Sequence, residues 1–139
     1  MASLTITRPI LLHVIVTEQF KQEMEAELQG AADTTQQRLD QIDFQARRIL
    51  ADLQRTDLTQ AMQVRQQIEA EKGRHQSAKE ELLERIKEVR ELALGSEFSR
   101  GTLEGIVEIK EGDHLYDKLG RTEIVVKDGV VVEIREPGG

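Results

Sequence analysis

The stretch Leu50–Gln63, "LADLQRTDLTQAMQ", lies in the middle of a helix-prone run that extends from residue 18 to residue 94. Thr56 and Asp57 are good N-cap residues, and "DLTQ" matches the Asp-x-x-Gln form of the capping box. We therefore expect one helix to end and a second to begin near residues 55–57. The alternatives are a break at Gly30 or Gly73, since glycine costs a helix about 1 kcal/mol relative to alanine, or one continuous helix.

Strand-like sequence flanks this run on both sides. The segment "SLTITRPILLHVIVT" (residues 3–17) alternates along one face, and Asp128-Gly129 separates two β-branched runs, which is a strong signal for a two-residue hairpin turn. A straight helix over 18–94 would be about 115 Å long and would separate the strands, whereas a bend brings Thr17 and Gly95 together. The sequence predicts an α+β fold with a long antiparallel coiled-coil helical hairpin (18–94). Its base is a small antiparallel β-sheet or half-barrel (1–17 and 95–139).

The two halves of the helical run carry apolar residues at helical spacing, and these residues can be paired across the bend. The best register places Leu28 opposite Ile86 and Ala46 opposite Ile68. Ala31 and Ile49 also belong to the seam, by which we mean the apolar contact between the two halves of the run. Its weak points are two layers, which set Ile42 against Glu71 and Leu39 against His75.

Composition excludes several classes of protein. The chain has no cysteine, which removes disulfides, thiol catalysis and thiolate metal sites. The apolar segment Ile10–Val16 is too short to cross a bilayer and is followed by no cleavage motif, so we expect a cytoplasmic protein without a membrane segment. A net charge of −7 gives no global attraction for nucleic acid.

Motifs for catalysis or cofactor binding are absent from the sequence. Asp113, His114 and Asp117 form one oxygen-rich group that could bind a divalent metal, but a solvated turn is the simpler interpretation. The chain ends in "REPGG", yet the order of its elements differs from that of ubiquitin-like carriers. We expect no enzymatic activity, no cofactor and no metal.

Charge is distributed unevenly along the helical run. Residues 18–43 carry two basic and seven acidic side chains, whereas residues 44–67 carry Arg47, Arg48, Arg55 and Arg65 against two aspartates. Arginine can pair bidentately with phosphate or carboxylate, so these four residues are candidate partner-binding residues. The simpler alternative is that they keep the end of the hairpin soluble.

The opening "ILLHVIVTEQF", the Gln- and Glu-rich centre and the closing "EIVVKDGVVVEI" resemble the YlqD-like family of uncharacterised bacterial proteins. The resemblance covers most of the chain. It implies an architecture and no catalytic residue, because the family has no established activity.

Three classes of function are compatible with these features. We favour a non-enzymatic interaction module whose hairpin contacts a protein or ribonucleoprotein partner. A prefoldin-like holdase would instead expose apolar residues at the bend, and Leu50, Leu53, Leu58 and Met62 are candidates. A transcription or RNA-processing factor would act through the bend with a close acidic pair for a metal, and the arginine between Asp52 and Asp57 argues against it. Contact of the four arginines with RNA phosphates is a separate alternative for the bend.

The strands also suggest self-association. Ile10–Val16 and Val130–Ile134 are apolar on two faces, so we expect a homodimer or higher oligomer formed through the base.

Overall fold

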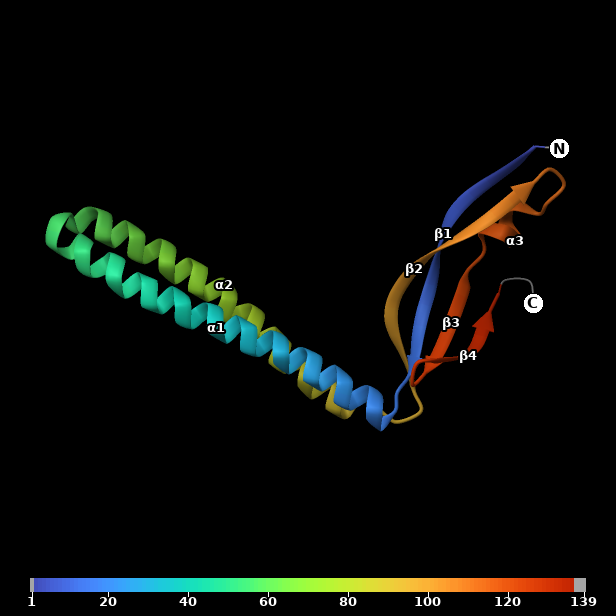
Figure 1. Cartoon of the computed structure of the whole chain (residues 1–139), viewed down its shortest axis with the longest axis horizontal. Coiled ribbons are helices and arrows are strands. Elements are labelled where there is room, and N and C mark those ends of the chain that lie inside the picture. Colours follow the sequence, from blue (N-terminus) through green and yellow to red (C-terminus); the bar gives the residue numbers. More distant parts are fainter. Residues whose placement is uncertain (1, 137–139) are drawn as a thin grey trace. The chain divides into compact units, whose positions relative to one another are not determined.

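The computed structural model describes residues 2–136, so the Gly138-Gly139 tail lies outside the described residues. The chain divides into two units, which we call the base (residues 2–21 and 92–136) and the hairpin (residues 22–91). The elements follow one another as strand, two long helices, strand, short helix and two strands (Figure 1). Within residues 2–136, no helix is long and apolar enough to cross a membrane. The predicted α+β fold, a long helical hairpin with a small sheet, is confirmed.

The base is a four-stranded sheet with strand order β2-β1-β3-β4. β1 (Ser3–Ile15) pairs along its whole length with β2 (Glu97–Lys110) in antiparallel orientation. β3 (Thr122–Lys127) pairs with β4 (Val130–Arg135), also in antiparallel orientation. Alternating apolar residues and β-branched side chains favour strands in all four segments.

One detail of the sheet differs from the expected antiparallel arrangement. β1 and β3 run parallel, with Ile10 beside Thr122 and Val14 beside Val126, so the sheet is mixed. The physical reason lies in the connection after β2, which contains the short helix α3 (Leu115–Leu119). Arg8 donates from its Nη1 to the Lys118 carbonyl at 2.6 Å, so α3 lies beside the first half of β1. The chain therefore enters β3 in the direction of β1.

The turn between β3 and β4 is also where the first helix is fastened. Asp128 and Gly129 have φ of 49° and 83°, as the Asp-Gly sequence predicts for this type of turn. The Thr17 hydroxyl donates to Asp128 Oδ1 at 2.6 Å and accepts from the Phe20 backbone N–H at 3.1 Å. Thr17 is thus the N-cap of α1 (Glu18–Thr56) and at the same time holds the turn.

Backbone hydrogen bonds join the two ends of the helical run. The Val16 N–H donates to the Ser96 carbonyl, and the Gly95 N–H donates to the Val16 carbonyl, each at 2.8 Å. Thr17 and Gly95 are therefore close together, as a hairpin requires and a single straight helix would not allow.

The two long helices are separated by one residue, Asp57. α1 ends at Thr56 and α2 (Leu58–Glu91) begins at Leu58. The Asp57 N–H still donates to the Leu53 carbonyl at 2.7 Å, while its Oδ1 accepts from the Gln60 N–H at 3.1 Å. Asp57 thus completes α1 and caps α2. Both helices continue through Gly30 and Gly73, where an added Cβ would meet no atom within 4 Å.

Three polar pairs fix the register of the hairpin. Lys72 Nζ lies 2.5 Å from Asp43 Oδ1, Lys79 Nζ lies 2.6 Å from Gln36 Oε1, and Arg90 Nε lies 3.0 Å from Glu25 Oε1. The two residue numbers add up to 115 in every pair. The hydrogen bond that the Lys72 ammonium donates to Asp43 raises the pKa of Lys72 above its usual value.

Parts of the expected seam are wrong by one position. Ala32 is buried, whereas Ala31 is exposed, and Glu71 faces solvent while its neighbour Lys72 reaches Asp43. Ile49 is 48% exposed, although we expected it in the seam. An α-helix has 3.6 residues per turn and drifts by about 20° per heptad against a 3.5-residue repeat, so the buried stripe passes to the next residue.

We predict that Asp57→Ala lowers the free energy of unfolding by about 1 kcal/mol, because α2 loses its cap. Asp57→Asn should retain most of the stability, since the amide oxygen can accept the same hydrogen bond. Asp52→Ala is a matched control, because it removes an exposed carboxylate from the last turns of α1 without touching the cap. Urea unfolding measures all three, and equal losses for Asp52→Ala and Asp57→Ala would contradict the capping role.

We also predict that Gly30→Ala and Gly73→Ala each raise the free energy of unfolding, by about 0.5–1 kcal/mol. Both positions are helical and open, so alanine adds helix propensity without a clash. Gly105→Ala should lower it instead, because the new Cβ would lie 2.3 Å from Ile10 Cδ1. Urea unfolding of the three variants measures these changes. A loss of stability in Gly30→Ala or Gly73→Ala would contradict the prediction and show that the glycine is needed for close packing.

Candidate functional site

The closed end of the hairpin, residues 44–67, holds the four arginines that the sequence identifies as candidates. We call it the tip. Arg47, Arg48 and Arg55 lie on the last turns of α1 and Arg65 on the second turn of α2, and all four are exposed. Among the described residues, none makes a hydrogen bond or an ion pair with these guanidinium groups. The N–H donors of these four guanidinium groups are therefore directed to solvent.

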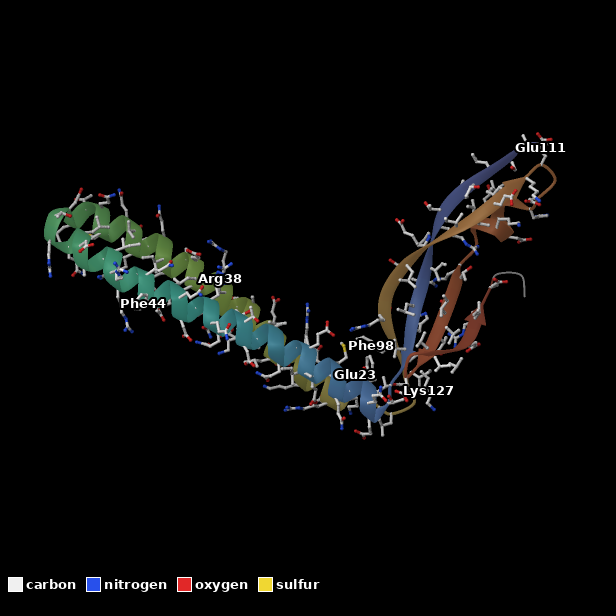
Figure 2. All side chains as sticks on the ribbon, viewed as in Figure 1. Glu23, Arg38, Phe44, Phe98, Glu111 and Lys127 are labelled. Carbon is white, nitrogen blue, oxygen red and sulfur yellow. The ribbon has the colours of Figure 1, made fainter. Side chains whose placement is uncertain are left out.

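Large apolar side chains are exposed beside these arginines. Phe44 is 66% exposed, and Leu58 and Met62 are each 68% exposed. Figure 2 shows the Phe44 side chain pointing away from the hairpin. Because burial of such side chains is what stabilises a helical hairpin, their position on the outside contributes nothing to its own fold.

Two of the four arginines each line a surface hollow together with one apolar residue. One shallow hollow of about 300 Å³ is lined on α1 by Gln45, Arg48, Ile49 and Asp52. A second, of about 420 Å³, is lined on α2 by Met62, Arg65, Gln66 and Glu69. Residues three, four and seven apart lie on one face of a helix, so each hollow presents a cation, an amide and an apolar side chain together.

The four apolar residues that the sequence placed near the bend differ in how far they are exposed. Leu58 and Met62 are exposed, but Leu50 and Leu53 are half-buried. Phe44 was not among the predicted residues. Its helical spacing could have identified it. Phe44 lies four residues before Arg48 and therefore on the same face of α1, and that face is opposite the one that carries the buried Ala46.

Composition also distinguishes this part of the hairpin. Between residues 28 and 68 the sequence contains neither lysine nor glutamate, and its charged side chains are arginines and aspartates. Protein–protein interfaces are enriched in arginine, methionine and aromatic residues and depleted in lysine and glutamate. The tip shares its arginines and its lack of lysine and glutamate with such interfaces, although it keeps two aspartates, a residue type that interfaces also deplete.

The base holds a second group of charged residues, which crosses the sheet. Arg135 on β4 pairs with Glu97 on β2, with Glu123 on β3 at 3.4 Å and with Glu133 at 3.0 Å. His13 Nε2 lies 3.6 Å from Glu123 Oε1. The hydrogen bonds from Arg135 hold the pKa of Glu97 below its usual value and raise that of Arg135.

These charged residues link the strands of the sheet to one another. Arg135 joins three carboxylates that belong to three strands, including both edge strands of the sheet. Within residues 2–136 no group of three His, Asp or Glu side chains has an arrangement that could hold a metal ion. His114 pairs with Asp117 at 3.9 Å, and Asp113 Oδ2 accepts from the Lys110 N–H at 2.8 Å, which holds the turn after β2.

Comparisons with known proteins agree with this architecture. Residues 4–135 match the family described as YlqD protein. The chain is 39% identical over 51 residues to the uncharacterised protein YlqD of Bacillus subtilis (strain 168), and that segment is 37% of this chain and 40% of the relative's length. A crystal structure of a protein of unknown function from Synechococcus sp. WH 8102 is similar with a TM-score of 0.80 and 31% identity. That similarity covers 97% of this chain and 96% of the other.

We predict that Glu97→Gln flattens the loss of stability in acid. Because the folded pKa of Glu97 lies below the ordinary value of 4.5, its contribution is present above pH 4.5 and is lost as the pH falls through the folded pKa. Urea unfolding at a series of pH values from about 7 to about 3 measures this slope. Glu104→Gln, an exposed glutamate on the same strand, is the control and should leave the slope unchanged. Identical slopes for wild type and Glu97→Gln would contradict the assignment.

Proposed function

This chain belongs to the YlqD protein family, and we propose that it is a non-enzymatic interaction module whose hairpin tip binds a protein partner. The partner surface would offer carboxylates next to an apolar pocket. The observation that carries this proposal is the combination of four unpaired, exposed arginines with exposed Phe44, Leu58 and Met62 on one end of the hairpin.

The charges support a protein partner over a nucleic acid. The chain carries a net charge of −7, which opposes approach to a polyanion. The tip itself carries four arginines against two aspartates, a net charge of only +2, so it is a weak cationic field within an acidic chain. Phosphate binding would also give no role to Leu58 and Met62, whereas burial of both against a partner removes apolar surface from water.

The chemistry of the tip supports binding rather than catalysis. Arginine keeps its proton at all ordinary pH values, so it cannot act as a general base. Of the two aspartates in the tip, Asp57 is committed to capping α2, so Asp52 has no second carboxylate available beside it for acid–base work. A guanidinium that meets a carboxylate forms charge-assisted, often bidentate, hydrogen bonds, which are stronger than bonds between neutral groups.

The test compares variants of the tip with a matched variant of the rest of the hairpin. The first variant carries glutamine at positions 47, 48, 55 and 65, and the second carries Leu58→Ser and Met62→Ser. The control replaces Arg38, Arg74 and Arg85, which are also exposed on the helices, by glutamine. Helix propensity changes little from arginine to glutamine, so thermal unfolding should report a similar stability for wild type and both glutamine variants. Serine is a poorer helix former than leucine or methionine, so the serine variant should be slightly less stable.

We predict that affinity capture from cells retains the same partner with wild type and with the control, and loses it with both tip variants. With that partner purified, loss of one or more interfacial arginine pairs should weaken binding at least about tenfold, and loss of the two apolar contacts should do the same. Titration calorimetry measures both.

Other outcomes would assign the tip differently. Salt-sensitive binding of free RNA that falls with each arginine removed would identify a phosphate surface. Suppression of aggregation of many unfolded proteins, lost in the Leu58/Met62 variant alone, would identify a holdase. Unchanged partners for both tip variants would leave the arginines as solubilising residues and end the proposal.

A further inference from the structure

We propose that one face of the base sheet, which we call the apolar face, packs against the apolar face of a second copy, so that the folded protein is a homodimer with two layers of sheet. This inference does not depend on the proposed function of the tip. It concerns another part of the chain and has its own test.

The strand register defines the apolar face. Side chains alternate between the two faces of a sheet, and directly paired residues lie on the same face. Leu4 pairs with Ile109, Ile6 with Val107, and Ile10 with Leu103. Farther along, Leu12 pairs with Ile124, which in turn pairs with Ile134. One face therefore carries apolar residues from all four strands.

These residues are incompletely covered. Leu4 is 64% exposed, Leu103 is 48% and Ile134 is 60%. The first two lie on β1 and β2 and the third on β4, so the exposure reaches from one edge of the sheet to the other. The helix α3 meets this face at Arg8, whose guanidinium is already bonded to the Lys118 carbonyl.

The base has almost no core of its own. Among its described residues the buried ones are Val16, Phe20, Thr122 and Val125. A sheet needs a second layer on its apolar face, and the two-stranded extension formed by Ser3–Pro9 with its partner on β2 would be marginal alone. A layer required for the fold must be present whenever the protein folds. A second copy of the chain always meets that condition, whereas another protein would have to be co-expressed.

Charge distinguishes the two faces of the sheet. Among the residues that the strand pairing assigns to the apolar face, Arg8 is the one charged side chain. The opposite face carries more charge: five glutamates (Glu97, Glu104, Glu108, Glu123 and Glu133) against Arg135, Lys110 and Lys127, with Arg135 paired to three of the glutamates. Two copies that met through the opposite face would bury these charged groups and bring two surfaces of net negative charge together, in a chain that already carries −7. Contact through the apolar face creates no such repulsion.

The available area is sufficient for a stable dimer. Four strands about 4.8 Å apart and about five residues long present roughly 300 Å², and the two-stranded extension adds roughly 200 Å². Two such faces together bury roughly 1,000 Å², which is the lower limit for a specific interface.

The first test measures mass in solution with one matched pair of substitutions. Leu103 and Ile106 lie on the same strand but on opposite faces, and Ile106 is the more exposed at 74%. We expect wild type and Ile106→Glu to sediment at twice the 15.8 kDa mass of one chain. Leu103→Glu and Ile134→Glu should weaken the dimer at least about 100-fold, because each buries a carboxylate in the interface.

Three results would overturn the proposal. The first is a monomer at about 100 μM wild type, a concentration at which a 1,000 Å² specific interface should be occupied. The second is equal weakening by Leu103→Glu and Ile106→Glu. The third is weakening by Ile134→Glu but not by Leu103→Glu, which would indicate that copies pair through the edge of β4 instead.

A second test avoids charged substitutions, in case these prevent folding. The chain has no cysteine, so Leu103→Cys and Ile106→Cys each introduce a single thiol. In a dimer, the thiol at position 103 should react with a maleimide at least about tenfold more slowly at high protein concentration than after dilution, whereas the thiol at 106 should react at one rate throughout. Equal, concentration-independent rates at both positions would overturn the proposal.

Discussion

The pairing of β1 with strands from the far end of the chain is the constraint on which the structure depends. β1 lies between β2 and β3, so both of its neighbours come after the two long helices. Its backbone groups can be satisfied only if the helical run returns to its starting point, and the hydrogen bonds between Val16 and residues 95–96 are where it does so. The hairpin, the base and the exposed tip all follow from that requirement.

The hairpin meets this requirement with a thin seam. Ala32, Ala46 and Ala61 are among its buried residues, and small side chains contribute less apolar burial than leucine or isoleucine. Polar pairs between the helices, such as Asp43 with Lys72, add register more than net stability, since exposed ion pairs are worth little. Few large apolar residues are thus buried between the two helices. Phe44, Leu58 and Met62 nevertheless lie exposed at the tip, where they add nothing to this seam.

Much of this architecture was predictable because the signals are local. Asp57 as an N-cap and Asp128-Gly129 as a turn depend on neighbours within three residues, and both predictions are confirmed. The parallel pairing of β1 with β3 was not predictable, because it depends on where α3 is held by Arg8, a contact between residues far apart in sequence. The seam of the hairpin was predictable only in part. Its spacing can be read locally, but the drift that buries Ala32 and exposes Ala31 accumulates over many turns. At the tip, the sequence identified the arginines by charge, whereas the exposure of Phe44 required the helix phase.

The constant register of the hairpin restricts how its length can vary among relatives. Residues pair across the hairpin with numbers that add up to 115, so an insertion in α1 alone would displace every pair on the tip side of it. Only insertions or deletions matched in both arms would keep Asp57 at the turn and leave the strands of the base in place. Each matched heptad would move the tip by about 10 Å along the hairpin axis without altering either end. The distance between the two ends of the hairpin can thus be changed in steps, independently of the residues at the tip.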